Sequence, residues 1–392
     1  MPRCPADSAR DARARLARVQ ERLVEERFDA AVLASEANFT YVTGYTTPSW
    51  AMTARPLTVV VEPDRCTAVV GSLDAEPLAA ACPWLEIVPY TDPSIRRLDG
   101  LCLADFAASA VELIAGVLDG RGVRRLGIEA SAPSASGLPH ASLLALAAAL
   151  GVELHDVAPV LWRLRQIKTP YELDRLAHVG QQLGRLYELF AERARPGMSE
   201  RELHGLVRSA AGEVDVDRIG YSIAIAGDSI GEGFPGERRW ERGELLLLDT
   251  SLVADGYASD FCRHYAAGDA DDAQVEGYAR LVRAVQAGRT ACRPGATMGD
   301  LVAAMVEHLP AQDGASPLDI GRIGHGIGLD LTEPPSVAPA DDTTLQPGMA
   351  LTVEPSGTYP CGHLEAEEMV AITDDGHRLL SPPYPAELPV LG

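Results

Sequence analysis

The sequence has little positive charge and no long apolar run. Its 34 lysine and arginine residues face 56 aspartate and glutamate residues, which leaves a formal net charge of −22 over 392 residues. No basic stretch offsets that balance, so nucleic acid and anionic membranes are excluded as expected partners. No apolar run approaches the ~18 residues that a membrane-spanning helix needs. The N-terminal segment also lacks the apolar core of a secretion signal.

Paired cysteines are also missing. The seven cysteines are scattered along the chain, and no two of them form a CxxC pair. An odd, dispersed set in a chain of this length predicts reduced thiols rather than a disulfide framework. Without a secretion signal, this indicates a cytoplasmic protein.

What is present is typical of a globular enzyme. Apolar residues make up 46% of the chain and charged residues 23%, and a chain of this length is expected to form two domains. Short apolar runs alternate with helical stretches over about the first 160 residues, which predicts an α/β layer arrangement. The expected strands are residues 30–34, 57–62, 66–71 and 126–130, and the expected helices are residues 103–120 and 141–151.

The pattern changes after that region. Thr169-Pro170-Tyr171-Glu172 combines a capping box with proline at the first helical position, which predicts a long helix ending before Pro196. A second helix is expected from Ser199. Beyond residue 220 the chain is rich in strands, so the second domain is predicted to be α+β. The expected domains are residues 1–160 and 161–392, with a helical pair at 273–289 and 298–309 interrupting the later strands.

Two carboxylates are placed together by one expected hairpin. Asp249 ends the strand ELLLLD, and Asp260 lies on the return strand after the turn signal Ala254-Asp255-Gly256. A turn centred on Ala254 and Asp255 would set the two acids directly opposite one another. A turn at Asp255-Gly256 would leave them diagonal but on the same face. Either way the carboxylates repel unless a proton or a cation lies between them.

A second acidic pair repeats this arrangement. Glu354 ends the strand MALTVE, the Gly/Pro-rich connection SGTYPCGH follows, and Glu367 opens the strand EEMVAIT. Between the two pairs lies His325, in a glycine-rich segment that lets the backbone approach closely and present the imidazole. Four carboxylates and one imidazole form a hard ligand set, which suits Mn²⁺, Fe²⁺, Co²⁺ or Zn²⁺. The set predicts a hydrolytic centre of two divalent ions.

At this point the chain resembles a known family. The segments GELLLLDTSLVADGYASDFCRHY, GHGIGLDLTEPP, GMALTVEPSGTYP and EAEEMVAITDDG are similar to the four signature blocks of the pita-bread metallopeptidases, which include aminopeptidase P, prolidase and creatinase. Residues 165–172 resemble the block that opens the catalytic domain of aminopeptidase P and prolidase. Residues 35–45 resemble the smaller creatinase-type N-terminal domain. The resemblance implies an α+β pita-bread catalytic domain preceded by a smaller α/β domain.

The resemblance also implies roles for the ligands. Asp249 would chelate one metal ion, Asp260 and Glu367 would bridge both ions, and His325 and Glu354 would bind the other. A bridging water would be the nucleophile, and Glu354 would take its proton and pass it to the leaving nitrogen. Creatinase-type proteins form dimers in which the N-terminal domain reaches the partner's active site. We therefore expect a homodimer, with Trp50 and Arg55 as candidates for that role.

The chain departs from the peptidases around the metal ligands. Aminopeptidase P and prolidase carry two further histidines and an arginine there, where this chain has Phe234, Thr332 and Glu365. His264 and His363 lie beside the signature blocks and are candidate replacements. We therefore predict a hydrolase that resembles Xaa-Pro peptidases and cleaves a C–N bond in a short peptide or similar small molecule, with an altered substrate pocket.

Other functions stay open. The departures also suit a small cationic or cyclic substrate, as in creatinase or ectoine hydrolase, although those relatives have lost the metal ligands that this chain keeps. A metal-retaining lyase similar to the dimethylsulfoniopropionate lyase is a further alternative. Gly227 to Gly231 matches the G-x-S-x-G motif with Ser229 as nucleophile, but the following EGFPGERRW is too rich in Gly and Pro to begin the required helix. A non-enzymatic binding protein is the last alternative.

Overall fold

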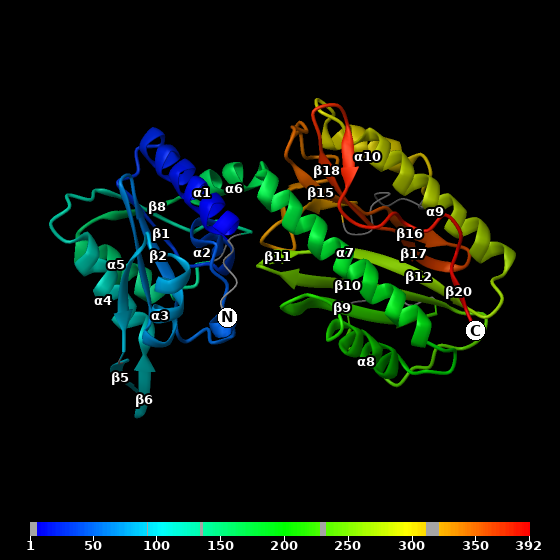
Figure 1. Cartoon of the computed structure of the whole chain (residues 1–392), viewed down its shortest axis with the longest axis horizontal. Helices are drawn as coiled ribbons and strands as arrows, with labels where there is room; N and C mark the ends of the chain where they lie inside the picture. Colours follow the sequence, from blue (N-terminus) through cyan, green and yellow to red (C-terminus); the bar gives the residue numbers. More distant parts are fainter. Residues whose placement is uncertain (1–5, 92, 134–135, 228–232, 311–320) are drawn as a thin grey trace. The chain divides into compact units, whose positions relative to one another are not determined.

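The computed structural model describes residues 6–91, 93–133, 136–227, 233–310 and 321–392. The chain divides into two compact units, Met1–Arg165 and Gln166–Gly392 (Figure 1). The described residues include no helix that is long and apolar enough to cross a membrane. Their six cysteines are all free thiols.

The first unit is built on a six-stranded mixed sheet with the strand order β4-β3-β2-β1-β7-β8. Its strands are β1 (Ala30–Leu33), β2 (Thr58–Glu62), β3 (Arg65–Gly71), β4 (Glu86–Tyr90), β7 (Arg125–Ile128) and β8 (Glu153–Asp156). Its helices are α1 (Ala6–Glu25), α2 (Glu36–Thr43), α3 (Ser72–Ala81), α4 (Phe106–Leu118), α5 (His140–Leu150) and α6 (Ala158–Gln166), with a short 3₁₀ turn at Pro48–Ala51. The four strands expected in this region are confirmed as β1, β2, β3 and β7, and α4 and α5 pack their apolar residues against them.

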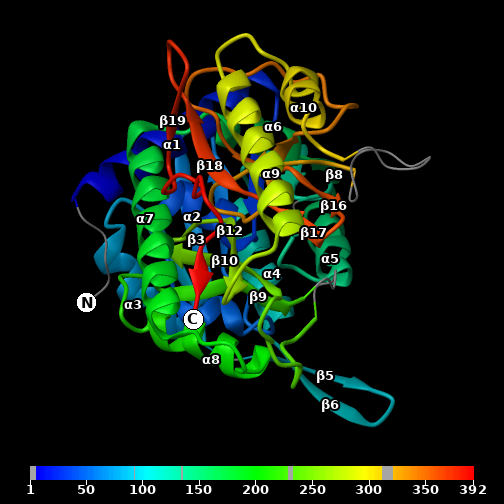
Figure 2. The same cartoon turned by 90° about the vertical axis from the view of Figure 1, so that its right-hand side faces the viewer.

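One predicted helix boundary in this unit is wrong. Residues 103–105 were expected to be helical, but they belong to β6 (Leu101–Asp105), which pairs with β5 (Ser94–Leu98). Figure 2 shows this hairpin extending away from the sheet. Helix α4 begins only at Phe106, because the Asp105 side chain accepts a hydrogen bond from the Ala108 N–H and so caps the helix.

The second unit contains two larger sheets. One has the order β11-β10-β12-β20 with β9 also paired to β10, and the other has the order β14-β13-β15-β18-β19. The first is formed by β9 (Arg218–Ala226), β10 (Leu245–Ala254), β11 (Tyr257–Ala258), β12 (Phe261–Ala267) and β20 (Val390–Leu391). The second is formed by β13 (His325–Gly326), β14 (Glu333–Ser336), β15 (Ala350–Val353), β18 (Glu368–Ile372) and β19 (His377–Leu379). The helices are α7 (Pro170–Arg193), α8 (Glu200–Ala211), α9 (Asp272–Ala291) and α10 (Met298–Val306).

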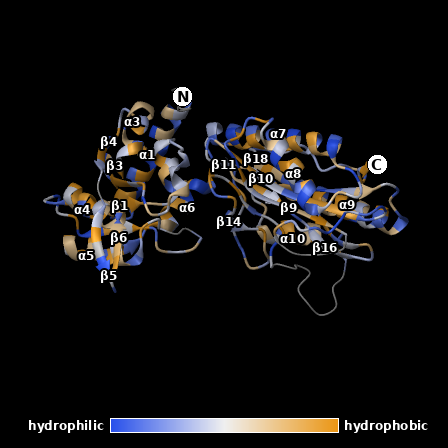
Figure 3. Ribbon diagram, turned by 90° about the horizontal axis from the view of Figure 1, so that it is seen from below, coloured by the Kyte–Doolittle hydropathy of each residue, from blue (hydrophilic) through white to orange (hydrophobic). Residues whose placement is uncertain are grey.

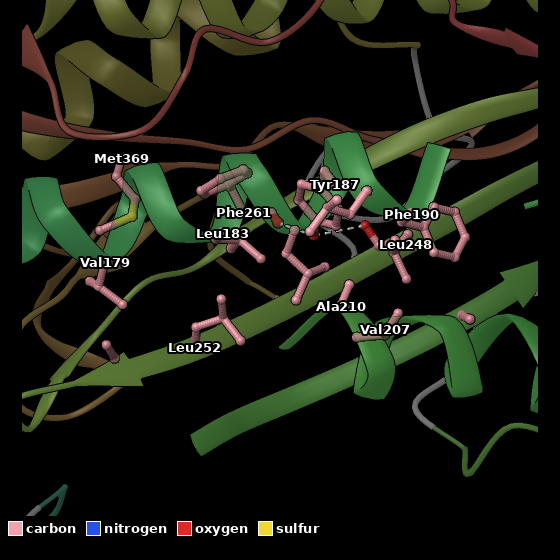
Figure 4. Packing of buried hydrophobic residues seen from close by; sticks show 14 of the residues in the cluster. Val179, Leu183, Tyr187, Phe190, Val207, Ala210, Leu248, Leu252, Phe261 and Met369 are labelled. Atoms are coloured by element: carbon pink, nitrogen blue, oxygen red, sulfur yellow. Dashed lines mark hydrogen bonds between the residues drawn. The ribbon is translucent and has the colours of Figure 1, made fainter. Parts of the chain in front are cut away.

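Helix α7 begins where the sequence predicts and packs one face into the core of this unit. Its predicted capping box is present, since Thr169 accepts from the Glu172 N–H and the Glu172 carboxylate accepts from the Thr169 N–H. The helix carries both hydrophilic and hydrophobic residues along its length in Figure 3, as expected for a helix that buries one face. Leu183, Tyr187 and Phe190 pack against β10 and β12 in Figure 4, each worth roughly 1.5–3 kcal/mol of burial.

The β10–β12 hairpin has the second of the two expected registers. Asp249 lies opposite Cys262, and Ala254 lies opposite Tyr257. The turn is therefore Asp255-Gly256, and the alternative register, in which Asp249 and Asp260 stand directly opposite one another, does not occur. Both turn residues have positive φ, 52° and 83°, which is the geometry of the two-residue Asp-Gly turn that matches strand twist. In this register the two acids are diagonal neighbours on one face.

The second acidic pair lies directly across its strand pair. Val353 of β15 pairs with Glu368 of β18, and the next position in this register sets Glu354 opposite Glu367. The Ala366 N–H donates to the Pro355 carbonyl at 3.0 Å, which continues the same register. The Gly/Pro-rich connection between the two acids contains a hairpin of its own, formed by β16 (Ser356–Tyr359) and β17 (Gly362–Glu365).

Candidate metal centre

His325 lies at the middle of the predicted centre. Its Nε2 is 3.5 Å from Asp260 Oδ2 and 3.9 Å from Glu354 Oε2. Its Nδ1 is 2.9 Å from the carbonyl oxygen of Gly326, so we place the ring proton on Nδ1. That assignment leaves the Nε2 lone pair facing the carboxylates, as a histidine metal ligand requires.

Backbone geometry fixes where that imidazole stands. Gly324 has φ +139°, and a Cβ at this position would lie 2.3 Å from the Thr352 carbonyl oxygen. The His325 N–H donates to Thr352 Oγ1 at 3.2 Å. Glycine is therefore needed at position 324, because any side chain would push the β13 segment away from β15.

Three of the five expected ligands form one buried group, and the other two act on it. Ligand atoms of Asp260, His325 and Glu367 lie within 4.8 Å of one another, and all three residues are buried. Glu354 Oε2 is 3.9 Å from His325 Nε2. The negative charge of Asp249 contributes to raising the pKa values of both Glu354 and Glu367. The hairpin registers of the two sheets therefore bring together residues that are up to 118 positions apart in the chain.

The electrostatics of this cluster fit a cation. Burial, reinforced by Asp260 and Glu354, holds the pKa of Glu367 well above its ordinary value. Burial together with Glu365 does the same for the pKa of Glu354, and burial raises the pKa of Asp260. Glu367 Oε1 and Glu354 Oε2 are buried and make no hydrogen bond with any described residue. Buried carboxylates with raised pKa values and no hydrogen-bond donor are suited to bind divalent ions, which supply the missing positive charge.

Glu365 and two histidines adjoin the cluster. The Glu365 N–H donates to His264 Nε2 at 3.1 Å, and His363 Nε2 lies 3.9 Å from Glu365 Oε2. Burial raises the pKa of Glu365, but the neighbouring side chains of His363 and Glu354 outweigh that effect and lower the pKa overall. Burial lowers the pKa of His264 to about 4, which keeps that ring neutral. The structure thus brings together three of the predicted pocket residues, Glu365, His264 and His363.

Cys262 belongs to the same region, and sequence reasoning assigned it no role. Its Sγ–H donates to the Glu365 carbonyl oxygen at 3.3 Å. Its sulfur and one carboxylate oxygen each of Glu365 and Glu367 also lie within 4.8 Å of one another. The signal was available in the alternation of β12, because Cys262 and His264 share one face of that strand and Asp260, just before it, continues the same alternation.

A buried ion pair supports the segment that follows His325. Lys168 Nζ lies 3.0 Å from Glu333 Oε2, with the two side chains 2% and 1% exposed. The Asp330 N–H donates to Glu333 Oε1 at 3.2 Å. Lys168 is the only lysine of the sequence. The resemblance of residues 165–172 to a family block pointed to this region, but the block alone did not identify the partner of Lys168.

Arg322 is the second residue that the sequence did not single out. Its Nη2 lies 3.5 Å from the hydroxyl oxygen of Thr332, a predicted pocket residue. Its charge also acts on Asp260, where it partly offsets the effect of burial on the pKa. The structure therefore places a guanidinium beside the metal cluster, where the sequence suggested only a hydroxyl.

The remaining predicted pocket residues are Phe234, Trp50 and Arg55. Phe234 is fully exposed. Trp50 and Arg55 belong to the first unit, where the Trp50 ring meets Phe39 edge-on at 5.5 Å and the Arg55 guanidinium lies 5.2 Å from the Phe106 ring centroid. Their suggested roles remain predictions. Ser229 lies outside the described residues.

Comparison with known sequences supports this interpretation of the site. The sequence model of metallopeptidase family M24 matches residues 174–375, and that of the creatinase/prolidase N-terminal domain matches residues 15–167. The probable dipeptidase PepE of Mycobacterium bovis is 31% identical over 320 residues, which cover 80% of this chain and 82% of that protein. The Xaa-Pro dipeptidase of Lactobacillus helveticus is 30% identical over 242 residues, covering 57% of this chain and 62% of that protein.

Solved structures show the same fold. The prolidase from Thermococcus sibiricus has a TM-score of 0.82 at 22% identity, covering 97% of this chain and 99% of that one. The Xaa-Pro dipeptidase from Bacillus anthracis has a TM-score of 0.81 at 24% identity, covering 97% and 100%. The predicted fold class, a pita-bread α+β domain after a smaller α/β domain, is confirmed.

Proposed function

The chain belongs to metallopeptidase family M24, and from that membership we propose that it hydrolyses the C–N bond of dipeptides or dipeptide-like small molecules. The observation that carries the proposal is the buried cluster of Asp260, Glu354 and Glu367 with His325, in which carboxylate oxygens of Glu354 and Glu367 make no hydrogen bond with described residues. Relatives named as dipeptidases support dipeptides as the substrate class.

The residues of the cluster fit the two divalent ions that the family uses. We propose that they are held by Asp249, Asp260, His325, Glu354 and Glu367. Oxygen and imidazole donors suit Mn²⁺, Fe²⁺, Co²⁺ or Zn²⁺. When bound, such ions supply Lewis acidity and lower the pKa of a bound water toward neutrality.

The protein's own groups would orient the substrate and move protons. Glu354 is our candidate general base, because its Oε2 lies 3.9 Å from His325 Nε2 and its side chain remains 16% exposed. The Gly326 carbonyl fixes the His325 ring, and the Lys168–Glu333 pair anchors the segment that carries Thr332. These contacts hold the ligands before substrate arrives, which reduces the reorganisation needed during reaction.

A second candidate function follows from Glu365. Its carboxylate lies near that of Glu354, so one end of the cluster is anionic. Such an environment also suits a small cationic metabolite, which would make the protein an amidinohydrolase of the creatinase or ectoine hydrolase kind. The metal requirement separates the two, since those relatives lack the metal ligands.

We also propose that the protein is a cytoplasmic homodimer. Free thiols at the six described cysteines support a reducing compartment, and the resemblance to creatinase-type proteins supports the dimer. In such a dimer Trp50 and Arg55 would serve the partner's site. Light scattering of the purified protein measures the dimer directly, and a monomer at micromolar concentration would count against it.

The function is tested by a substrate and metal screen. The chelator-treated protein is supplemented with each of the four ions and offered Xaa-Pro dipeptides, other dipeptides, cyclic amidines and small amides. We expect metal-dependent turnover of at least one dipeptide, lost again on adding chelator and unaffected by a serine-directed phosphonate. Turnover of amidines alone supports the second candidate, and dipeptide turnover that survives chelation contradicts the metal assignment.

A further inference from the structure

Glu365 makes one side of the metal cluster unsuitable for a substrate carboxylate. Its peptide group is fixed by three bonds, because its N–H donates to His264 Nε2 at 3.1 Å while its carbonyl accepts from Cys262 Sγ at 3.3 Å and from the Tyr384 hydroxyl at 3.1 Å. Its side chain is nevertheless 18% exposed. A substrate carboxylate on this side would therefore meet the Glu365 carboxylate, and like charges repel strongly at partly buried positions.

Arg322 offers the opposite charge. Its guanidinium contacts Thr332 Oγ1 at 3.5 Å, and no carboxylate oxygen in the part of the chain that the structure describes lies within 4.0 Å of it. The side chain is half-buried. A guanidinium that adjoins the cluster without a carboxylate of its own is suited to accept one from a ligand, because its planar fork matches a carboxylate with two hydrogen bonds.

The sheet order separates these two charges. The strands run β14-β13-β15-β18-β19. Arg322 precedes β13 by three residues and Thr332 immediately precedes β14, whereas Glu365 ends β17 and Glu367 immediately precedes β18. The row formed by His325, Glu354 and Glu367 therefore has the guanidinium at its β13–β14 side and the extra carboxylate at its β18 side.

We propose that Arg322 is a specificity-determining residue that binds the free carboxylate of the substrate, with Glu365 excluding that carboxylate from the other side of the cluster. The proposal rests on the proposed hydrolytic function of the site. It implies that a dipeptide is oriented with its carboxylate toward Arg322 and Thr332 and its ammonium group toward Glu365. C-terminal amides of the same dipeptides lose the contact that Arg322 provides.

The test compares Arg322→Gln with the wild type on paired substrates. Each pair is a dipeptide that the wild type cleaves and its C-terminal amide. Loss of a charge-assisted contact is expected to raise KM for the free dipeptide about 10- to 100-fold while KM for the amide changes less than about 2-fold. Arg293→Gln, an exposed arginine of the same unit, is the control and should change neither. An equal loss for both members of a pair, or an unchanged preference, overturns the proposal.

A binding measurement separates this inference from the proposed function. Reduced dipeptide analogues, in which CH₂–NH replaces the amide, are titrated into metal-supplemented wild type and Arg322→Gln as acid and amide forms. A preference for the acid that is lost in the variant supports Arg322 even if no dipeptide is hydrolysed, a result that would count against the proposed function alone. Equal affinity of the wild type for the acid and amide forms overturns the role of Arg322 whatever the turnover. Unchanged melting of the variant confirms that the fold is intact.

Discussion

Replacing Lys168 with methionine should destabilise the second unit in a strongly pH-dependent way. The ammonium lies 3.0 Å from Glu333 Oε2 and both side chains are almost completely buried. Removing one partner of such a pair generally costs about 3–5 kcal/mol. The carboxyl group can limit that cost by taking up a proton. At pH 7 this costs about 1.36 kcal/mol for each unit above the ordinary glutamate pKa of about 4.3, or about 3.7 kcal/mol. We therefore expect a loss of about 3–4 kcal/mol at pH 7 that shrinks to about 1 kcal/mol at pH 5.

Urea unfolding followed by circular dichroism at both pH values measures these losses. Lys168→Arg is the matched variant that keeps the charge, and overpacking by the larger guanidinium should cost about 1–3 kcal/mol with little pH dependence. Adding Glu333→Gln to Lys168→Met should restore most of the stability at pH 7, because the carboxylate that lost its cation is gone. A Lys168→Met loss below about 1 kcal/mol at pH 7, or the same loss at pH 5 and pH 7, would refute this reasoning.

Three further predictions concern the neighbourhood of the metal ligands. Gly324→Ala should reduce metal affinity and destabilise the fold by about 3 kcal/mol or more, because its Cβ would meet the Thr352 carbonyl at 2.3 Å; Gly299→Ala, where no such contact exists, is the control in titration and urea unfolding. The lowered pKa of His264, about 4 instead of 6.5, contributes stability that is complete above pH 6.5 and lost as the pH falls toward 4, by up to about 3 kcal/mol; His264→Gln should remove this slope from the metal-free unfolding curve. The raised pKa values of Glu354 and Glu367 make the metal-free protein less stable as the pH rises above about 4.5, so Mn²⁺ should raise the melting temperature more at pH 8 than at pH 5, and an equal rise at both would contradict the assignment.

Local sequence signals were sufficient for the elements that carry the ligands. The Asp255-Gly256 turn is a strong hairpin signal, and the register that it sets could have been chosen over the alternative from the positive φ that Asp-Gly turns adopt. The capping box at Thr169 and Glu172 located the start of α7 correctly. These features depend on residues close together in the sequence, which is why the pattern revealed them.

Contacts between distant segments could not be predicted in the same way. Nothing near Lys168 indicates that its carboxylate partner is Glu333, because the pair spans 165 positions and forms only when the segment before α7 meets the start of β14. The contact of Arg322 with Thr332 likewise depends on how the β13 and β14 segments lie beside each other. The β16–β17 hairpin was hidden by its Gly and Pro content, although it is what places Glu365 and His363 beside the cluster.

Metal stoichiometry tests the central claim most directly. The protein is saturated with Mn²⁺ or Zn²⁺, freed of excess ion, and analysed by elemental mass spectrometry together with Asp260→Ala and Glu367→Ala, with the exposed Glu237→Gln as control. The account predicts about two ions per chain in the wild type and in Glu237→Gln, and loss of both ions in the other two variants. Fewer than about one ion per chain in the wild type, or full occupancy in Asp260→Ala and Glu367→Ala, would contradict it.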